Sequence, residues 1–311
     1  MRSKNLPLIR SYFLACARIG EAVLAEDLLN DMESSNSMRN KVVKPDEYTY
    51  NCVISAWARK KGSKEAAEHA QSLLHRMTKN LHAGPDTISF NTALNAWSNV
   101  GGPFAVKRAD ELLTLMEKAT AMESNVKVNR KSYTSVLKSI ERSRTSDIPN
   151  RVVNILERMM DQYENGNRDA LPDSISYNAA IGAFKATEGT DDDKVHALRL
   201  LQIVFTDMQE APNVEPDHIT YKLMLQACEA LINDGNEIDL VTKNVFQQAC
   251  LDGRVNKTVF DQFQKISPTM FDEIVGSKQF EELPSDWKRR VSVWRPPKGR
   301  RNSRAYTKSK S

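Results

Sequence analysis

The sequence of 311 residues predicts an all-α protein, a right-handed α-solenoid made of repeated helix–turn–helix units. Three observations predict this fold. A short motif returns along the chain at nearly regular spacing. Apolar residues between its copies follow the spacing of amphipathic helices, and polar residues with a proline separate one copy from the next. Nothing in the sequence supports a β-sheet.

The motif consists of a polar residue, usually Asp after Pro, followed four positions later by an aromatic residue. It reads PDEYTYN from Pro45 and PDTISFN from Pro85, and three more copies follow. The polar residues, here called closing residues because each ends one repeat, are spaced 40, 43, 44 and 44 positions apart; they are Asp46, Asp86, Asn129, Asp173 and Asp217. The spacing predicts five clear repeats, and the segment from Arg10 to Gly20 predicts a fainter one at the N-terminus.

Each repeat is predicted to fold as two helices. In the first helix Tyr50, Val53, Ile54 and Trp57 stand at positions i, i+3, i+4 and i+7, which is the spacing of one helix face. The second helix is illustrated by AAEHAQSLLHRM, in which an apolar stripe ends at Met77. Such a hairpin cannot bury its apolar stripe alone, so neighbouring repeats are expected to stack and share a continuous core.

The predicted repeats, numbered 1 to 6, span residues 6–46, 47–86, 87–129, 130–173, 174–217 and 218–257. Extra residues such as SRTSDIPN and EGTDDD, the latter with Asp191 to Asp193, are expected to form loops. Residues 258–287 are expected to form a helical cap over the end of the array, anchored by Leu283 and Trp287. Residues 288–311 are expected to be a basic, disordered tail.

Charge is unevenly distributed along the chain. There are 44 basic and 40 acidic residues, but residues 288–311 contain ten Lys or Arg and no acid. The remainder therefore carries a net charge of −6, from 34 basic and 40 acidic residues. We expect the tail to be an arm that contacts phosphates without reading sequence, in preference to a tail that only keeps the protein soluble.

The sequence contains no catalytic motif and no membrane span. No run approaches 18 apolar residues, and the phosphate-binding loop, zinc-protease, nucleophile-elbow and deaminase motifs are absent. His69, His75 and His82 are spaced wrongly for a helical zinc pair. The cysteines are expected to be reduced and buried; they are Cys16, Cys52, Cys228 and Cys250. We expect a protein that is not an enzyme and has no cofactor or metal.

The repeat resembles that of the pentatricopeptide repeat family, as a P-type array with long units of 40 to 44 residues. The resemblance covers residues 6–257. It rests on the aromatic–Asn pair of the first helix, on the closing Pro-Asp, and on a Met near the end of the second helix; these are Met77, Met116, Met160 and Met208. The Leu-Gly pair that is typical of tetratricopeptide repeats is absent.

This resemblance implies that the chain binds single-stranded RNA, with two or three side chains of each repeat reading one base. The implied reader pairs combine the residue after the aromatic with the closing residue of the same repeat. They are Asn51 with Asp86, Asn91 with Asn129, Thr134 with Asp173, and Asn178 with Asp217. The implied base-flanking residues stand three positions before each first reader; they are Tyr48, Ile88, Ile175 and Ile219, with Lys131 at that place in repeat 4.

The family's pairing preferences imply uracil for Asn with Asp, cytosine for Asn with Asn, and guanine for Thr with Asp. The implied core is 5′-UCGU-3′, with one undetermined base on each side from the repeats that hold Arg10 and Lys222. The family also implies a role in the stability, processing or translation of RNA in a mitochondrion or plastid.

Other interpretations of the same residues stay open at this point. Asp or Asn before a helix is also a good N-cap, worth about 1 kcal/mol, and both roles can coexist. Asn inside a helix is harder to explain structurally because it is a mediocre helix former. Trp57 and Trp97 fit the core better than a base-stacking platform. The concave face of the array could instead bind a protein, which the net negative charge of residues 1–287 favours. We expect a monomer whose partners are single-stranded RNA and, as an alternative, proteins.

The N-terminus is also open to two interpretations. Arg2, Lys4, Arg10 and Arg18 precede the first acidic residue, Glu21, as in an organelle transit peptide. The same residues fit the repeat, so Met1 is expected to lie inside an array that begins further upstream.

Overall fold

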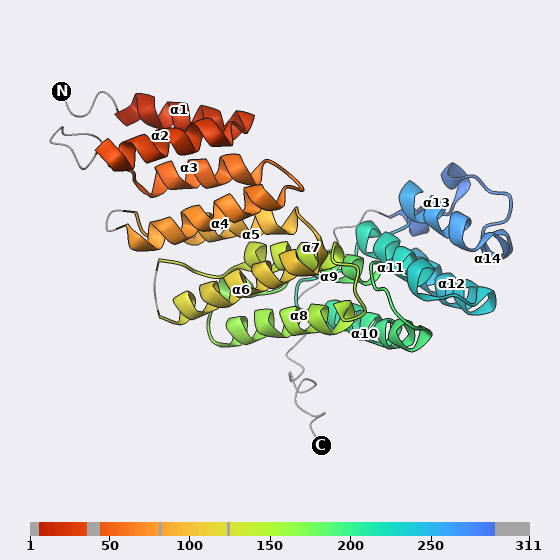
Figure 1. Ribbon diagram of the computed structural model, residues 1–311. Coiled ribbons are helices and arrows are strands. Elements are labelled where there is room, and N and C mark those ends of the chain that lie inside the picture. The colour runs from red at the N-terminus through yellow and green to blue at the C-terminus, as the bar shows by residue number, and fades with distance from the viewer. Residues whose placement is uncertain (1–5, 36–43, 81–82, 123–124, 290–311) are drawn as a thin grey trace, which may run out of the picture. The chain divides into compact units, whose positions relative to one another are not determined.

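The computed structural model describes residues 6–35, 44–80, 83–122 and 125–289 (Figure 1). These residues form fourteen α-helices and three short 3₁₀ helices, with no β-strand among them. The chain divides into two compact units, one up to Leu201 and one from Gln202 onwards, and the division falls inside α10. The predicted all-α solenoid fold is confirmed.

The N-terminal unit contains hairpins in which a first and a second helix alternate. They are α1 (Leu6–Ile19) with α2 (Ala22–Ser35), α3 (Glu47–Ala58) with α4 (Lys64–Lys79), α5 (Thr87–Ser98) with α6 (Gly102–Ala121), and α7 (Arg130–Glu141) with α8 (Ile148–Glu164). The 3₁₀ turn η1 (Arg168–Ala170) leads to α9 (Ser174–Phe184), and α10 (Asp191–Glu210) begins in this unit. The first helices form a row, because α1, α3, α5, α7 and α9 each pack against the next.

Glycine sets the turn between the two helices of the first hairpins. The chain reverses at Gly20 and at Gly62, where φ is +80° and +77°. Glycine adopts these values without the steric penalty that a Cβ atom imposes. The N-terminal hairpin therefore turns in the same way as the hairpin that follows it.

Aromatic residues at equivalent positions fill the core of the N-terminal unit. Trp57, Trp97 and Phe184 are nearly inaccessible, as are Tyr50 and Tyr133. Burial of each such side chain contributes about 2 kcal/mol or more to folding. The interpretation of both tryptophans as core residues is confirmed.

The cysteines are free and buried, as the sequence predicts; they are Cys16, Cys52, Cys228 and Cys250. Burial raises the pKa of Cys228 and of Cys250 to about 12. A thiol with so high a pKa carries almost no reactive thiolate at neutral pH.

Some of the residues predicted to form loops are helical. Asp191, Asp192 and Asp193 form the first turn of α10, where acidic side chains are favoured because they oppose the helix dipole. Asp193 accepts hydrogen bonds from the backbone N–H and the hydroxyl of Thr190, both at 2.8 Å, and these bonds lower its pKa. In SRTSDIPN the last three residues already belong to α8. The inward-facing methionine of α8 is Met159, and its neighbour Met160 is only half-buried.

The C-terminal unit holds the rest of α10 and four further helices. They are α11 (His218–Leu231), α12 (Gly235–Leu251), α13 (Lys257–Ile266) and α14 (Pro268–Ile274), followed by the 3₁₀ turns η2 (Phe280–Glu282) and η3 (Ser285–Lys288). α13 packs against both α11 and α12. The rings of Phe246 and Phe263 stack at the centre of this unit, with centroids 4.3 Å apart.

Both predicted anchors of the last segment pack into this unit. Leu283 is buried. Trp287 meets Phe246 edge-on, with ring centroids 6.2 Å apart, and its carbonyl accepts the backbone N–H of Val255 at 2.9 Å. That residues 258–287 serve as a cap on the array stays a prediction. The predicted tail lies outside the described residues from position 290 onwards.

Candidate nucleic-acid interface

Each closing residue is the N-cap of the first helix that follows it. Asp86 accepts a hydrogen bond from the backbone N–H of Ser89 at 2.7 Å, and Asp173 does so from Ser176 at 2.9 Å. The same bond forms at the three others, which are Asp46, Asn129 and Asp217. The N-cap interpretation is confirmed, and it fixes each closing side chain at the start of a first helix.

Two predicted reader pairs are joined by hydrogen bonds. The Asn51 amide Nδ2 donates to both carboxylate oxygens of Asp86, at 3.2 and 3.3 Å. The Asn91 amide Nδ2 donates to Asn129 Oδ1 at 3.4 Å. In both pairs the closing side chain therefore accepts two kinds of hydrogen bond. One comes from the N-terminus of the helix that it caps, and the other comes from the reader amide of the preceding first helix. Asn51 Oδ1 is buried and accepts no hydrogen bond from any described residue.

The third predicted pair has a different geometry. Thr134 is buried, and its hydroxyl donates to the carbonyl of Arg130 at 2.8 Å. Asp173 accepts from Ser176 with one oxygen, and its other oxygen lies 3.4 Å from Arg130 Nη1. No hydrogen bond joins the described side chains of Thr134 and Asp173.

The fourth predicted pair belongs to two different units. Asn178 is half-buried on α9 in the N-terminal unit. Asp217 caps α11 in the C-terminal unit. Their pairing stays a prediction.

The predicted base-flanking residues are exposed apolar side chains. Ile88 and Ile175 are 63% and 65% exposed, Tyr48 is 39% exposed and Ile219 is 46% exposed. Each stands two positions after a closing residue, which places it in the first turn of a first helix. These exposed side chains add little to the core. At the same position in repeat 4, Lys131 is exposed.

The first repeat carries an ion pair where repeats 2 and 3 carry an amide bonded to the closing residue. Arg10 Nη2 lies 2.5 Å from Asp46 Oδ2, and the guanidinium stands 5.4 Å from the ring centre of Tyr48. Burial acts to raise the pKa of Asp46, but hydrogen bonds from Arg10 and Thr49 outweigh it and lower that pKa. In the last predicted repeat, Lys222 is half-buried on α11.

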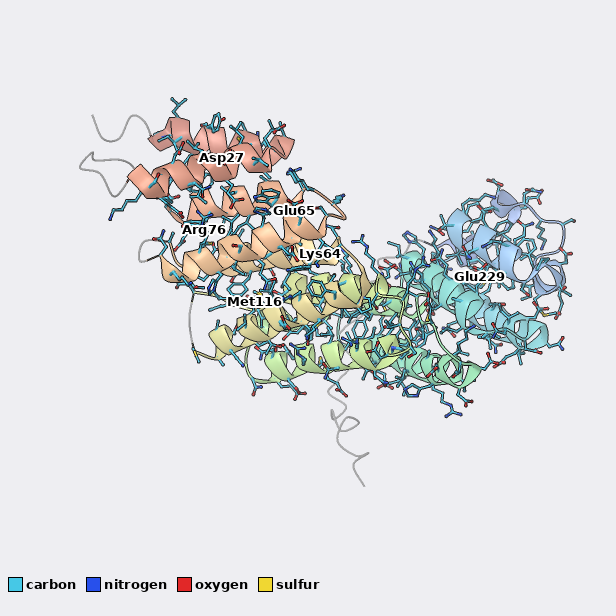
Figure 2. The ribbon with its side chains drawn as sticks, viewed as in Figure 1. Asp27, Lys64, Glu65, Arg76, Met116 and Glu229 are labelled. Carbon is cyan, nitrogen blue, oxygen red and sulfur yellow. The ribbon has the colours of Figure 1, made fainter. Side chains whose placement is uncertain are left out.

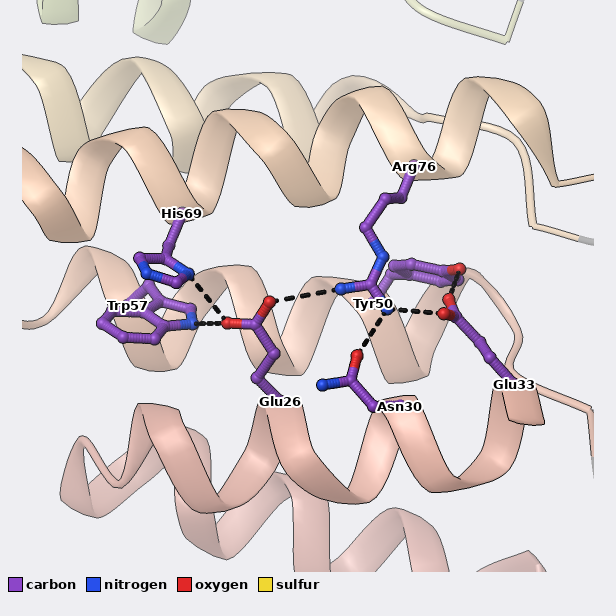
Figure 3. A network of polar contacts seen from close by, with 7 residues as sticks. All are labelled: Glu26, Asn30, Glu33, Tyr50, Trp57, His69 and Arg76. Atoms are coloured by element: carbon purple, nitrogen blue, oxygen red, sulfur yellow. Dashed lines mark hydrogen bonds and ion pairs between the residues drawn. The ribbon is translucent and has the colours of Figure 1, made fainter. Parts of the chain in front are cut away.

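Two arginines that the sequence reasoning missed connect successive second helices. Arg76 of α4 is labelled in Figure 2. It donates to Glu26, Asn30 and Glu33 of α2, at 3.2, 2.8 and 2.5 Å (Figure 3). Arg158 of α8 donates to Asp110, Thr114 and Glu117 of α6, at 2.5, 3.2 and 2.8 Å. Each arginine directly precedes a fully buried methionine, and this Arg-Met pair is a signal that the sequence offered.

The start of a seventh first helix, α13, is also absent from the sequence prediction. Asn256 caps α13 by accepting the backbone N–H of Val259 at 3.0 Å, and the buried Phe260 follows four positions later. This is the spacing of closing residue and aromatic in the five predicted copies. The copy lacks both Pro-Asp and Tyr, but the four-residue spacing could have identified it.

Two kinds of feature are absent from the described ranges: a metal-binding cluster and a membrane-spanning helix. No group of three or more His, Cys, Asp and Glu residues there could hold a metal ion. No helix within the described residues combines the length and the apolar character that crossing a membrane requires.

No protein-family model and no curated protein matches the chain. Among solved structures, the crystal structure of the pentatricopeptide repeat protein PPR10 from maize matches with a TM-score of 0.56 and 20% identity, over 86% of this chain and 33% of that one. A structure of PPR10 in complex with an 18-nt psaJ RNA element matches with a TM-score of only 0.28 and 16% identity, over 88% of this chain and 47% of that one.

The chain thus spans about a third of the solved protein whose fold it shares. The likeness to this solved structure and the regularly spaced N-caps of the first helices both indicate stacked helical hairpins. The fold of this chain is that of a pentatricopeptide-like repeat solenoid.

Proposed function

We propose that the chain binds single-stranded RNA along its row of first helices and selects the sequence through its reader pairs. The observation that carries this proposal is the recurrence of an exposed apolar side chain, most clearly Ile88 and Ile175, three positions before a half-buried Asn. An apolar side chain on each side of a base supplies stacking contact, and the amide supplies hydrogen bonds to the base edge.

The chemistry of the first two pairs suits base edges. An Asn amide offers two donors and a carbonyl acceptor, and the closing residue fixes its orientation. PPR10, whose fold the chain shares, has been solved in complex with RNA.

The proposed core sequence is 5′-UCGU-3′. It assigns uracil to Asn51 with Asp86, cytosine to Asn91 with Asn129, and uracil to Asn178 with Asp217. It assigns guanine to Thr134 with Asp173, whose geometry differs from that of the first two pairs. The proposed setting is a mitochondrion or plastid, where binding would affect the stability, processing or translation of an RNA.

Selection from randomised single-stranded RNA tests this function directly. The full chain is expected to enrich sequences that contain a UCGU-like core. Replacement of Asn91 and Asn129 is expected to change the preferred base at the second position alone. Enrichment of an unrelated sequence would contradict the assignment, and a uniform loss of affinity in the variant would show that these residues only support the fold.

A protein-binding scaffold is the second candidate, and the acidic charge of the chain without its tail favours it. The two functions differ in how a chain that ends at residue 287 behaves. An RNA-binding array is expected to stay on single-stranded RNA in a salt-dependent way, because it still contacts phosphates. A scaffold is expected to lose all retention when the basic tail is removed.

A further inference from the structure

Repeat 4 differs from its neighbours at the residues that would face RNA. In repeats 2, 3 and 5 the base-flanking position holds Tyr48, Ile88 and Ile175, all apolar and exposed. In repeat 4 it holds Lys131, whose ammonium group has no partner among the described residues. A cation in this place cannot sandwich a base between apolar side chains as an isoleucine can.

The reader side chain of repeat 4 is turned away from the surface. Thr134 is only 8% exposed, and its hydroxyl donates to the Arg130 carbonyl at 2.8 Å. A threonine hydroxyl has one proton to donate, and here the helix backbone already accepts it. Asn51 and Asn91 instead direct an amide towards the closing residue.

The closing residue of repeat 4 is covered by a cation. One oxygen of Asp173 accepts hydrogen bonds from the backbone and the hydroxyl of Ser176, at 2.9 and 3.0 Å. The other oxygen faces Arg130 Nη1 at 3.4 Å. An approaching nucleotide would therefore meet the guanidinium of Arg130 as well as the carboxylate.

Exposed cations lie close together at the start of α7, on the side of the first helices that carries the reader residues (the reader face). Lys127, Arg130 and Lys131 are exposed and lie within five positions of the chain. Arg130 and Lys131 directly follow the closing residue of the preceding repeat. At the same place, repeats 3 and 5 have the uncharged pairs Thr87-Ile88 and Ser174-Ile175. Arg130 shares one of its five N–H donors with Asp173, so the others are available to a phosphate.

We propose that repeat 4 holds the RNA backbone through Arg130 and Lys131 and does not select a base. The chain then recognises 5′-UCNU-3′, with any base at N, in place of 5′-UCGU-3′. This inference rests on the proposed function, since it requires RNA to lie along the reader face. Exposed cations of this kind add affinity that is independent of sequence and falls with salt.

The four oligonucleotides that contain UCNU within one unstructured flanking sequence test this inference. The full wild-type chain is expected to bind all four with dissociation constants within about twofold, a difference of less than 0.5 kcal/mol by the usual conversion. Replacement of C at the second position by any other base is expected to weaken binding about tenfold.

Conversion of repeat 4 to the sequence of repeat 5 is the sharper experiment. The variant Arg130→Ser, Lys131→Ile, Thr134→Asn changes RKSYT to SISYN, which is the sequence of residues 174–178. This variant is expected to prefer U at N by about tenfold. Because two phosphate contacts are lost, the slope of the logarithm of its binding constant against log salt is expected to fall in magnitude by about 1.4. Arg151→Ser, which removes a cation from α8, is the matched control and is expected to change neither quantity.

The outcomes separate the two proposals. A tenfold preference of the wild-type chain for G at N, or an unchanged salt slope in the converted variant, overturns the inference and leaves the proposed function intact. If neither protein discriminates at the second position, or neither binds any of the oligonucleotides, both proposals are wrong. A converted variant with the helicity and unfolding midpoint of the wild type shows that any change in preference arises at the reader face.

Discussion

A half-buried arginine joins α2 to α4 and another joins α6 to α8, whereas no arginine joins the described residues of α4 and α6. Arg76 and Arg158 directly precede the inward-facing methionines of their helices. In α6 the residue in this place is Leu115, which is 52% exposed. In the same pairs of repeats, Trp57 of α3 donates to Glu26 of α2, and its counterpart Trp97 of α5 donates to the neutral Gln71 of α4, both at 2.8 Å.

Successive repeats of the N-terminal unit can therefore pack through either a charged or a neutral polar contact. Nearest-neighbour contacts in a solenoid contribute almost independently, so each can be charged or neutral provided that its apolar stripe is buried. Burial acts to lower the pKa of Arg158, but hydrogen bonds with Glu117 and Asp110 outweigh it and raise that pKa. The charged contacts are therefore well paired, and removal of one partner leaves the other uncompensated.

The largest effect is expected from Arg158→Met. This substitution leaves Glu117, whose side chain is only 17% exposed, with the Tyr133 hydroxyl as its remaining partner. We expect a loss of about 2–3 kcal/mol, somewhat below the cost of breaking a fully buried pair. The urea unfolding midpoint, followed by circular dichroism, measures it. Arg151→Met on the same helix removes an exposed ion pair and is expected to cost less than about 0.5 kcal/mol; equal losses would contradict the comparison.

A smaller loss, about 1–2 kcal/mol, is expected from Arg76→Met. Glu26 keeps the indole N–H of Trp57 and the contact with His69, so its carboxylate stays partly compensated (Figure 3). The same unfolding measurement, made on both arginine variants, ranks the two charged contacts. A larger loss for Arg76→Met than for Arg158→Met would show that the residual partners of Glu26 do not matter.

Alkaline pH is expected to weaken both charged contacts through their tyrosines. Burial and the neighbouring Glu33 raise the pKa of Tyr50 to about 12, and burial beside Glu117 raises the pKa of Tyr133 further. Because the folded-state pKa exceeds the unfolded value, this stabilisation is complete below about pH 10 and is lost as pH rises towards 12.

Tyr133→Phe tests this dependence. It is expected to cost about 1 kcal/mol at neutral pH, through the lost hydrogen bond to Glu117, and to make the decline in unfolding midpoint above pH 10 shallower. An unchanged decline in the variant would assign the alkaline sensitivity to other groups.

The smallest effect is expected from building a charged contact where none exists. Leu115→Arg alone is expected to be nearly neutral because the side chain is exposed. Combined with Gln71→Glu it supplies the pair that Arg76 forms with Glu26, and a gain of about 0.5 kcal/mol is expected. A double-mutant cycle of unfolding midpoints isolates the coupling, and a coupling of zero would show that the α4–α6 spacing cannot accommodate the pair.

Much of the fold could be predicted from the sequence because its signals are local. The closing residues and the aromatic four positions later reveal the start of each first helix, and both are determined by capping and helical spacing. Asp191 to Asp193 were misread because a run of acids suits a solvated loop and a first helical turn equally well. The copy at Asn256 is harder to recognise because it lacks Pro-Asp and carries Asp261, not Asn or Thr, after its aromatic residue.

The candidate site could be predicted only in part. Positions 51 and 86 could be paired because the repeat supplies their register, and their amide and carboxylate do meet. The inward turn of Thr134 and the capture of Asp173 by Arg130 could not be predicted, since they depend on rotamers and on a neighbour 43 positions away. The same holds for Arg76 and Arg158, whose partners lie 41 to 50 positions earlier in the chain.

The capping role of the closing residues limits how such an array can evolve. A side chain that must begin a helix can be exchanged only among Asp, Asn, Ser, Thr and Gly without loss of stability. If the proposed reader pairs select bases, one residue of each pair is therefore restricted by helix formation, whatever base the repeat meets. Under that proposal, Asp–Asn exchange at this position changes specificity without loss of the cap, and wider chemical variety has to come from the partner inside the first helix.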